Sequence, residues 1–413
     1  MKNSLVSLLL ILTSAFLFAQ TATGDIEDYV GNIIDNAPGS TGDNFIEPNT
    51  TQLNTWNTVI DFILVEDLIN ARSNANGLNY QITEFTDISI LPNQLFYVLE
   101  EKSPQANYWG TYIFSQSPFR NNLIIQAPHS KFDTNTGKEA IYCFKNTLAK
   151  AVFINGTHRC NSNSFSSCSG TTSVCGSSQS YRISDLAHTT TSMFQKTTEN
   201  LFKNISNSVF IQLHGFGKQS TDPYVIMSNG TRETPPTDYA VLIKDALLSE
   251  DNTLTFQLAH INTSWTRLIG FTNTQGRLIN SSPNFCNTSA TTTSGRFVHI
   301  EQEKSKLRDN EVGWGKMSNA LSNVFASTLS NDEFGIKNKI VVYPNPSQEK
   351  VFIEGENIQY VDVYNMLGQK IMTKYNSQNN NSVILNFNNR LNKTYFLRIV
   401  TNSKSVLKKV ILL

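Results

Sequence analysis

The sequence predicts an α/β protein with a three-layer αβα domain on a mainly parallel or mixed sheet, followed by a small C-terminal β-sandwich. Between residues 120 and 300, short apolar runs alternate with segments of helical spacing, as is typical of α/β domains. From residue 340 onward, short runs alternate apolar with polar residues and are separated by Asn, Ser and Gly, a pattern that predicts strands and turns. At roughly 150 residues per domain, a chain of 413 residues has room for both parts.

The first 20 residues predict a secretory signal. Lys2 precedes an apolar stretch from Leu5 to Ala19, and the small residue Ala19 stands just before Gln20. This arrangement of charge, apolar run and small residue is typical of a cleaved signal peptide. A membrane-spanning helix needs about 20 apolar residues, whereas this stretch is 15 residues long and contains Thr13 and Ser14. We therefore expect residues 1–19 to be a signal peptide that is removed.

A domain over residues 25–335 follows from the alternation of the next elements. Residues 123–126, 151–154, 209–213 and 297–300 are short apolar runs that predict buried strands, and residues 137–151, 192–205 and 239–247 have the spacing of helices. In open α/β sheets, functional sites lie at the carboxyl ends of the strands. The polar residues after these runs are therefore the candidates for chemistry.

Three such residues predict a metal centre. His129 follows the first strand, His214 follows the third, and Glu301 follows the last. Two imidazoles and a carboxylate are a usual open ligand set for catalytic Zn²⁺, with water in the fourth position. The metal would lower the pKa of that water and polarise a carbonyl group, while Glu301 would carry the proton. Glu303 is the alternative proton carrier, because strand alternation places it on the same face as Glu301.

The third ligand has two candidates, Asp133 in the loop after His129 and Glu139 in the first turn of the next helix. We expect Glu139, because the helix would fix its direction whereas a loop Asp often caps a helix. Glu139 could equally be an acid that the helix dipole favours in a first turn.

Other polar residues have a structural and a functional interpretation. Arg159 would bind a substrate carboxylate through its forked guanidinium group or form a surface ion pair, and Arg308 has the same two interpretations. His158 and His188 would support the metal ligands from behind, although His188 could also lie in a surface loop. His260 and His299 are expected to be structural.

The order of these residues resembles that of the zinc amidases. Ala127-Pro-His129-Ser through Gly137-Lys-Glu139, then Leu213-His214-Gly, then Ile300-Glu301 are similar to motifs of N-acetylmuramoyl-L-alanine amidases, N-formylglutamate amidohydrolases and poly-γ-glutamate hydrolases. The resemblance implies an architecture of zinc carboxypeptidase type, zinc held by His129, Glu139 and His214, and acid–base catalysis by Glu301. The Gly-His-Gly-Gly loop of the amidases is replaced here by Pro-His-Ser-Lys, which leaves the substrate class open.

The expected function is therefore that of an exported zinc-dependent hydrolase that cleaves an amide bond in a cell-wall peptide, polyglutamate or an N-acyl amino acid. A zinc carboxypeptidase or esterase would use the same metal site. A protein of another class, a non-catalytic adhesin or glycan-binding protein, would disperse the histidines. Lys plus Arg and Asp plus Glu both number 33, and a chain without excess positive charge is a poor candidate for binding nucleic acid.

Residues 340–413 carry a second resemblance. Tyr343-Pro-Asn-Pro, the run 361–370 (VDVYNMLGQK), Tyr395-Phe-Leu-Arg-Ile and Lys408-Lys-Val-Ile resemble the C-terminal sorting domain of the Bacteroidetes type IX secretion system. This resemblance implies export across both membranes, to the medium or the bacterial cell surface, with the secretion machinery as a partner. Export permits disulfides, and we expect a bridge among Cys160, Cys168 and Cys175.

Overall fold

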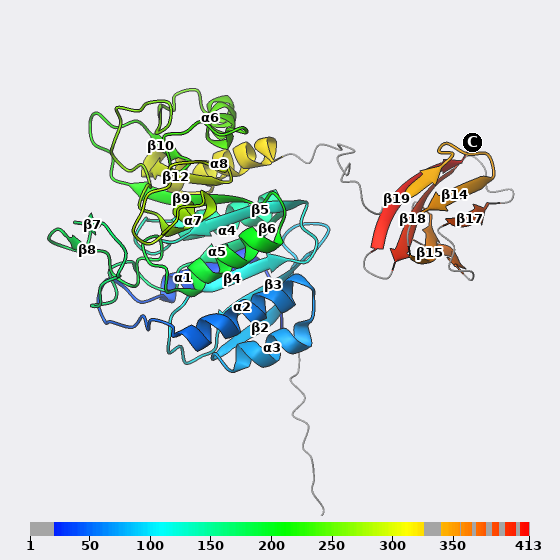
Figure 1. The fold of residues 1–413 in the computed structure, drawn as a ribbon, viewed down its shortest axis with the longest axis horizontal. Coiled ribbons are helices and arrows are strands. Elements are labelled where there is room, and N and C mark those ends of the chain that lie inside the picture. Colours follow the sequence, from blue (N-terminus) through cyan, green and yellow to red (C-terminus); the bar gives the residue numbers. More distant parts are fainter. Residues whose placement is uncertain are drawn as a thin grey trace, which may run out of the picture. The chain divides into compact units, whose positions relative to one another are not determined.

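The computed structural model describes residues 20–325, 340–355, 357–365, 369–376, 382–387, 393–401 and 405–412. The expected signal peptide lies outside these residues. The chain divides between residues 327 and 328 into two compact units, which Figure 1 shows in blue to yellow and in orange to red. None of the described helices combines the length and the apolar character needed to cross a lipid bilayer.

The first unit is built on one mixed sheet. In spatial order its strands are β1 (Gln20–Gly24), β2 (Tyr80–Asp87), β3 (Gln94–Glu101), β4 (Thr111–Ser115), β6 (Ala149–Ile154), β5 (Arg120–Ala127), β9 (Val209–Phe216), β12 (Phe297–Glu303), β10 (Val225–Ser228) and β11 (Phe256–Leu258). The central strands β6, β5, β9 and β12 are mutually parallel, whereas β4 and β10 flank them in the antiparallel direction. The carboxyl ends of the four central strands therefore meet at one edge of the sheet.

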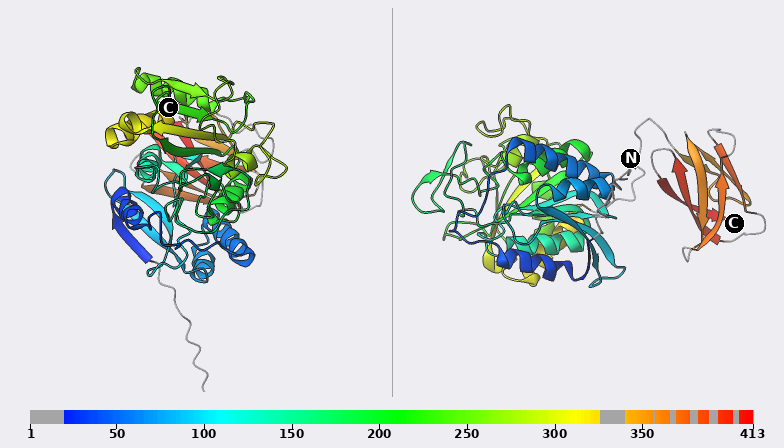
Figure 2. Two further views of the ribbon diagram at one scale, coloured as in Figure 1. Left: turned by 90° about the vertical axis from the view of Figure 1, so that its left-hand side faces the viewer. Right: turned by 90° about the horizontal axis from the view of Figure 1, so that it is seen from below.

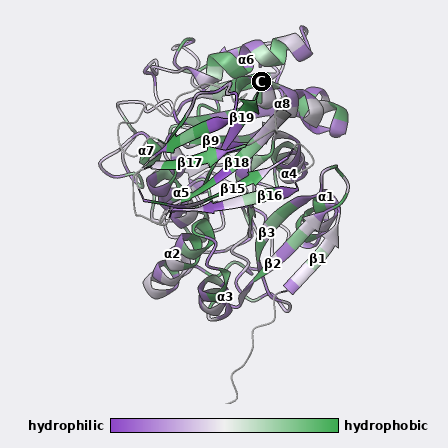
Figure 3. Cartoon of the chain, turned by 90° about the vertical axis from the view of Figure 1, so that its right-hand side faces the viewer, coloured by the Kyte–Doolittle hydropathy of each residue, from purple (hydrophilic) through white to green (hydrophobic). Residues whose placement is uncertain are grey.

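Helices cover both faces of this sheet (Figure 2). One face carries α1 (Ile26–Asn36), α4 (Thr136–Thr147), α6 (Tyr239–Glu250) and α8 (Glu311–Val324), and the other carries α2 (Thr50–Leu64), α3 (Leu68–Asn76), α5 (Met193–Asn204) and α7 (Thr274–Ile279). Alternate residues of β5 and β9 pack into the two layers: Ile125 and Ile211 face α4, whereas Ile124 and Phe210 face α5. Strand β9 is accordingly coloured mostly hydrophobic in Figure 3. The predicted three-layer αβα class is confirmed.

Two predicted boundaries differ from the structure. The helix expected over residues 137–151 ends at Thr147, because Leu148 adopts a left-handed conformation with φ 50° and the chain enters β6 at Ala149. Strands β9 and β12 are longer than expected, so His214 and Glu301 lie within the strands, near their carboxyl ends, rather than after them. Their side-chain directions are therefore set by the sheet.

The second unit consists of two antiparallel sheets that share one core. One sheet contains β13 (Val341–Tyr343), β14 (Lys350–Glu354) and β17 (Ser382–Asn386), and the other contains β16 (Lys370–Tyr375), β15 (Ile358–Tyr364), β18 (Lys393–Thr401) and β19 (Ser405–Leu412). Val351 and Leu385 of the first sheet belong to the same buried cluster as Val361 and Leu397 of the second. This arrangement is the small β-sandwich that the strand spacing predicts.

Candidate metal centre

His129, Asp133 and His214 form a compact group at the carboxyl edge of the sheet. Nδ1 of His129 lies 3.0 Å from Nδ1 of His214 and 3.2 Å from Oδ2 of Asp133, and Nδ1 of His214 lies 3.4 Å from the same oxygen. All three side chains are buried. Within the described part of the chain, this is the set of His, Cys, Asp or Glu side chains that could hold a metal ion.

The local backbone explains why these residues converge. His129 follows the end of β5 by two residues, and a tight turn returns the chain at once, with the Asp133 N–H donating to the His129 carbonyl oxygen at 2.9 Å. Strand β9 runs parallel beside β5 and carries His214 to the same edge. The Gly215 N–H then donates to Oδ2 of Asp133 at 3.1 Å. Asp133 is thereby fixed between the two strand ends.

His129 is held from its far side by a buried ion pair. Its Nε2 lies 2.8 Å from Oδ1 of Asp185, and Oδ2 of Asp185 accepts from Nε (2.9 Å) and Nη2 of Arg159. Because an ionised carboxylate only accepts hydrogen bonds, the His129 proton lies on Nε2 in the neutral ring, and the Nδ1 lone pair faces His214 and Asp133. Asp185 was not among the sequence candidates, although it stands three residues before His188.

His214 has a comparable arrangement. Its Nε2 lies 2.8 Å from Oε1 of Gln212, two residues earlier on the same strand. Its ring lies 4.4 Å, centroid to centroid, from that of His299 on β12. Both imidazoles of the group therefore turn Nδ1 toward the centre and Nε2 toward a buried oxygen.

Burial and the neighbouring charges shift the pKa values of the group. Burial lowers the pKa of His214 to about 3, so this ring is neutral at pH 7. Burial and Arg159 oppose protonation of His129, but Asp185 and Asp133 outweigh them and raise its pKa. Burial alone would raise the pKa of Asp133, yet the two imidazoles hold it well below its usual range. The centre thus presents an ionised carboxylate beside two imidazole nitrogens.

Glu139, the expected third ligand, lies elsewhere. It is fully buried in α4 and accepts from Nε2 of Gln302 at 2.9 Å, while its Oε1 has no partner among the described residues. Burial raises the pKa of Glu139 to about 8, so this carboxyl group is mostly neutral at pH 7. The structure brings Asp133, not Glu139, to the two histidines, because the turn after His129 is tighter than a direct entry into the helix.

Glu301 stands beside the group on the neighbouring strand. It is the register partner of His214 in the pairing of β12 with β9, so the two side chains project on the same face. Its Oε1 lies 3.4 Å from Nε2 of His299, and its buried Oε2 has no partner among the described residues. Glu303 instead accepts from the Lys306 N–H at 3.0 Å and caps the short π-helix η1 (Lys304–Arg308). The two carboxylates that spacing could not separate thus have different surroundings.

The remaining candidates lie at different distances from the centre. Nη1 of Arg159 is 3.3 Å from Nδ1 of His129. His188 stacks on Tyr181, with ring centroids 3.8 Å apart, and its ring is 6.4 Å from that of His129. His158 packs edge-on against Phe132, and its Nδ1 accepts from the Cys160 N–H at 3.1 Å.

Two further candidates take structural contacts. Arg308 is buried and donates to the carbonyl oxygens of Gln302, Thr134 and Phe216. It therefore ties together the loop of Asp133 and the ends of β9 and β12. His260 pairs with Asp238, which caps α6, through a contact of 2.7 Å.

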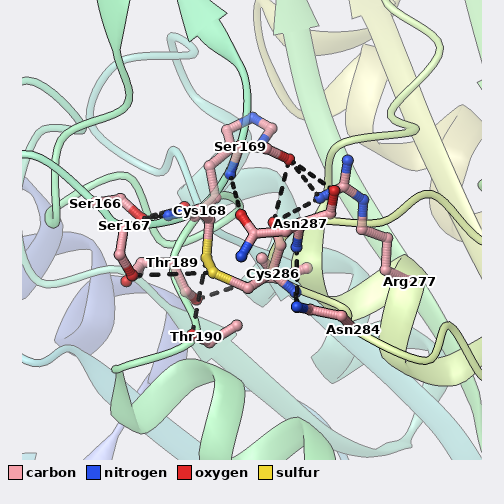
Figure 4. Close-up of a disulfide and its surroundings, with 12 residues drawn as sticks. Ser166, Ser167, Cys168, Ser169, Thr189, Thr190, Arg277, Asn284, Cys286 and Asn287 are labelled. Atoms are coloured by element: carbon pink, nitrogen blue, oxygen red, sulfur yellow. Dashed lines mark hydrogen bonds between the residues drawn. A yellow bond between two sulfur atoms is a disulfide. The ribbon is translucent and has the colours of Figure 1, made fainter.

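Two disulfides fasten the segment between β6 and α5, which carries Arg159 and Asp185. Cys160 bonds to Cys175 and Cys168 bonds to Cys286, whereas Cys143 is free and buried. Figure 4 shows the second bridge, where Arg277 donates to the Cys286 carbonyl oxygen at 2.7 Å. The expected bridge within the trio is present, and the second bridge ties the segment to the loop after α7.

A family model described as a secretion system C-terminal sorting domain matches residues 341–413, which is the β-sandwich. The second unit is a type IX sorting domain. This domain directs export, so the protein is secreted or held at the cell surface, and the secretion machinery is its partner through this domain. The match covers the sorting domain alone.

Other similarities are limited. The chitinase ChiA of Flavobacterium johnsoniae is 36% identical over 93 residues, which are 21% of this chain and 6% of that protein. The zinc-free apo form of YNDL is 14% identical, covers 53% of this chain and 91% of its own, and has a TM-score of 0.28. A protein provisionally described as a carboxypeptidase A from Shewanella denitrificans is 14% identical. The match covers 52% of this chain and 61% of that chain, with a TM-score of 0.32. Such low scores transfer neither a fold nor a residue role to the first unit.

Proposed function

We propose that the first unit is a zinc-dependent hydrolase that cleaves an amide bond, with His129, Asp133 and His214 as the metal ligands. The observation that carries the proposal is the mutual approach of three buried donor atoms at 3.0, 3.2 and 3.4 Å. Two imidazole lone pairs so close together repel each other unless a proton or a cation lies between them. A cation shared by all three atoms would relieve that repulsion.

The donor set fits zinc in kind and in spacing. Zinc accepts imidazole nitrogen and carboxylate oxygen at roughly 2.0–2.2 Å in tetrahedral sites, so neighbouring ligand atoms are about 3.3 Å apart. The three observed separations lie around that value. Three protein ligands also leave a fourth position free, as catalytic zinc sites do.

When bound, zinc lowers the pKa of a coordinated water and polarises the carbonyl group of a substrate. Glu301 supplies the proton acceptor in this proposal. Its unpartnered Oε2 is free to take a proton from the attacking water and to deliver it to the leaving amine. Glu303 is occupied by its cap on η1, which favours Glu301 between the two candidates.

Arg159 is proposed to contact the substrate as well. Two of its nitrogens are held by Asp185, and Nη1 remains beside Nδ1 of His129. Once that lone pair is engaged in a ligand bond, the Nη1–H can donate to an oxygen of the substrate. A carboxylate or a carbonyl oxygen next to the scissile bond would both meet this donor.

The geometry favours a metal enzyme over a non-catalytic adhesin, because the rings of His129 and His214 lie 4.7 Å apart rather than dispersed. Cell-wall peptides, polyglutamate and N-acyl amino acids all present an amide carbonyl that suits the proposed centre. A carboxypeptidase or esterase would use the same ligands, so the substrate is decided by hydrolysis assays.

The test is metal analysis of the full exported chain, with His129→Ala, His214→Ala and Asp133→Ala as variants. The wild type should retain one divalent ion per chain after dialysis, and each variant should lose it. Hydrolysis of muramyl peptides, γ-glutamyl polymers and formylated amino acids is then compared at equal metal content. A wild-type chain that takes up no stoichiometric metal would end the proposal.

A further inference from the structure

We propose that Gln212 is a positioning residue of the metal centre. Gln212 belongs to a chain of hydrogen-bonded, buried side-chain amides that begins at a backbone carbonyl group. This chain determines which nitrogen of His214 carries the proton. The inference rests on the proposed function where it concerns the metal. The position of the proton, however, can be measured in the metal-free protein.

Gln212 is placed for this role by the strand. It stands two residues before His214 on β9, so both side chains project from the same face of the sheet. Its side chain is fully buried. Oε1 accepts from Nε2 of His214 and from Nδ2 of Asn273, and Nε2 donates to Oε1 of Gln126 and of Gln275, both at 3.1 Å. All four hydrogen-bonding positions of this amide are used.

The direction of the chain is set at one end by Leu186. A backbone carbonyl oxygen can only accept, and that of Leu186 lies 2.8 Å from Nε2 of Gln275. Gln275 must therefore turn its NH₂ group toward Leu186 and its Oε1 toward Gln212. Gln212 then donates through Nε2 and presents its oxygen to His214.

At a second end of the amide chain, Thr198 independently sets the same orientation of the Gln212 amide. The Thr198 hydroxyl donates to the Phe194 carbonyl oxygen at 2.9 Å, so it accepts from Nε2 of Gln126 at 2.9 Å. Gln126 consequently offers its oxygen to Gln212. Reversing the Gln212 amide would place its oxygen against two other oxygens in a buried site, where each unsatisfied polar group costs stability.

The consequence for His214 follows directly. Facing an oxygen that only accepts, Nε2 of His214 carries the hydrogen, and Nδ1 keeps its lone pair for the centre. The same network reaches the other imidazole, because Leu186 follows Asp185, which orients His129. Gln212 and Gln275 thus connect the supports of both nitrogen ligands.

The test compares Gln212→Met with Gln126→Met in the full chain. The two glutamines are fully buried register partners on adjacent strands, and each variant removes one amide from the network. In Gln126→Met, the Leu186 carbonyl still sets the direction of Gln275 and Gln212. We expect Gln212→Met to weaken Zn²⁺ affinity about 10- to 100-fold, as loss of a partner behind a ligand does. For Gln126→Met we expect Zn²⁺ affinity to change by less than about threefold, although its loss of thermal stability should be similar to that of Gln212→Met. Affinity is measured by competition with a chelator.

Histidine ¹⁵N chemical shifts of the metal-free protein provide the second measurement. Wild-type His214 should show the proton on Nε2, and Gln212→Met should show a mixture of both tautomers. A wild-type proton on Nδ1, or equal losses of affinity in the two Met variants, would overturn the proposal. If the wild type binds no metal, the proposed function fails while the nitrogen shifts still decide the positioning role. Should Gln212→Met not fold, the nitrogen shifts of wild-type His214 still decide the inference, because a proton on Nδ1 would overturn it.

Discussion

Nε2 of His129 lies 2.8 Å from Oδ1 of Asp185, on the side of the ring opposite Asp133 and His214. Asp185 is also the carboxylate partner of Arg159. One side chain therefore orients a proposed ligand and neutralises a buried cation.

Replacing Asp185 with Asn should weaken both functions of this side chain. We expect metal affinity to fall about 10- to 100-fold and stability to fall by about 3–5 kcal/mol, because Arg159 is left as an unpaired buried charge. Asp238→Asn is the matched control, since Asp238 makes a comparable contact with His260 away from the centre. Chelator competition and urea unfolding measure the two effects. Equal losses of metal affinity in both variants would contradict this role.

The identity of the third ligand can be tested by two substitutions. Asp133→Ala should abolish stoichiometric zinc binding, because it removes one of three donor atoms. Glu139→Gln should leave zinc binding within about threefold of the wild type, because Glu139 bonds to Gln302 rather than to the histidines. Isothermal titration with zinc separates the two candidates, and loss of binding in Glu139→Gln would restore Glu139 as the ligand.

Glu139 also predicts a pH dependence of stability. Its pKa is raised by burial from 4.5 to about 8 in the folded state, so the folded protein holds this proton more tightly than the unfolded chain. The contribution of Glu139 to the free energy of unfolding is therefore most favourable below pH 4.5 and is lost progressively as the pH rises to about 8. Glu139→Gln, which stays neutral, should gain stability relative to the wild type across that interval. Urea midpoints measured at several pH values test this, and a constant difference would contradict it.

Glu301→Gln should separate catalysis from metal binding. Loss of general acid–base function typically lowers rates by about 10²–10⁴-fold, and the proposed ligands are unchanged. Glu303→Gln is the control, because its carboxylate caps η1. We expect a large fall in kcat for the first variant and a small one for the second, with equal zinc content in both. The reverse order would make Glu303 the proton carrier.

Gly215 is required by the close approach of Arg308. A Cβ at this position would lie 2.2 Å from Cζ of Arg308, whereas a Cβ at Gly217 would meet no atom within 4 Å. Gly215→Ala should therefore destabilise the protein by about 1–3 kcal/mol, the usual cost of overpacking, and Gly217→Ala should be nearly neutral. Thermal unfolding of the two variants tests the difference.

The sequence predicted the class of the fold because the central strands are apolar on both faces and helices intervene between them. It did not reveal β1 to β4 or α1 to α3, because helices and strands do not alternate there and the strands pair mostly antiparallel. The order of His129, His214 and Glu301 along one sheet edge followed from the parallel direction of their strands.

The supports of the site were not predicted, because they depend on tertiary contacts. Asp185 reaches His129 across 56 positions of sequence, and Asp133 rather than Glu139 lies beside the two histidines because of a turn whose geometry no spacing rule specifies. The sequence does contain one signal: the apolar runs 123–127 of β5 and 209–213 of β9 each include a single glutamine, Gln126 and Gln212. A buried amide in an otherwise apolar run needs partners, and here those partners lead to the proposed metal centre.

The two disulfides have a consequence for where the protein can act. Both secure the segment that holds Asp185 and Arg159, and such bonds persist in oxidising surroundings but not in a reducing cytoplasm. Inside the producing cell the support of His129 would lack its covalent fastening. The proposed hydrolase would thus be completed only after it leaves the cytoplasm, and peptides in the cytoplasm would be spared during synthesis.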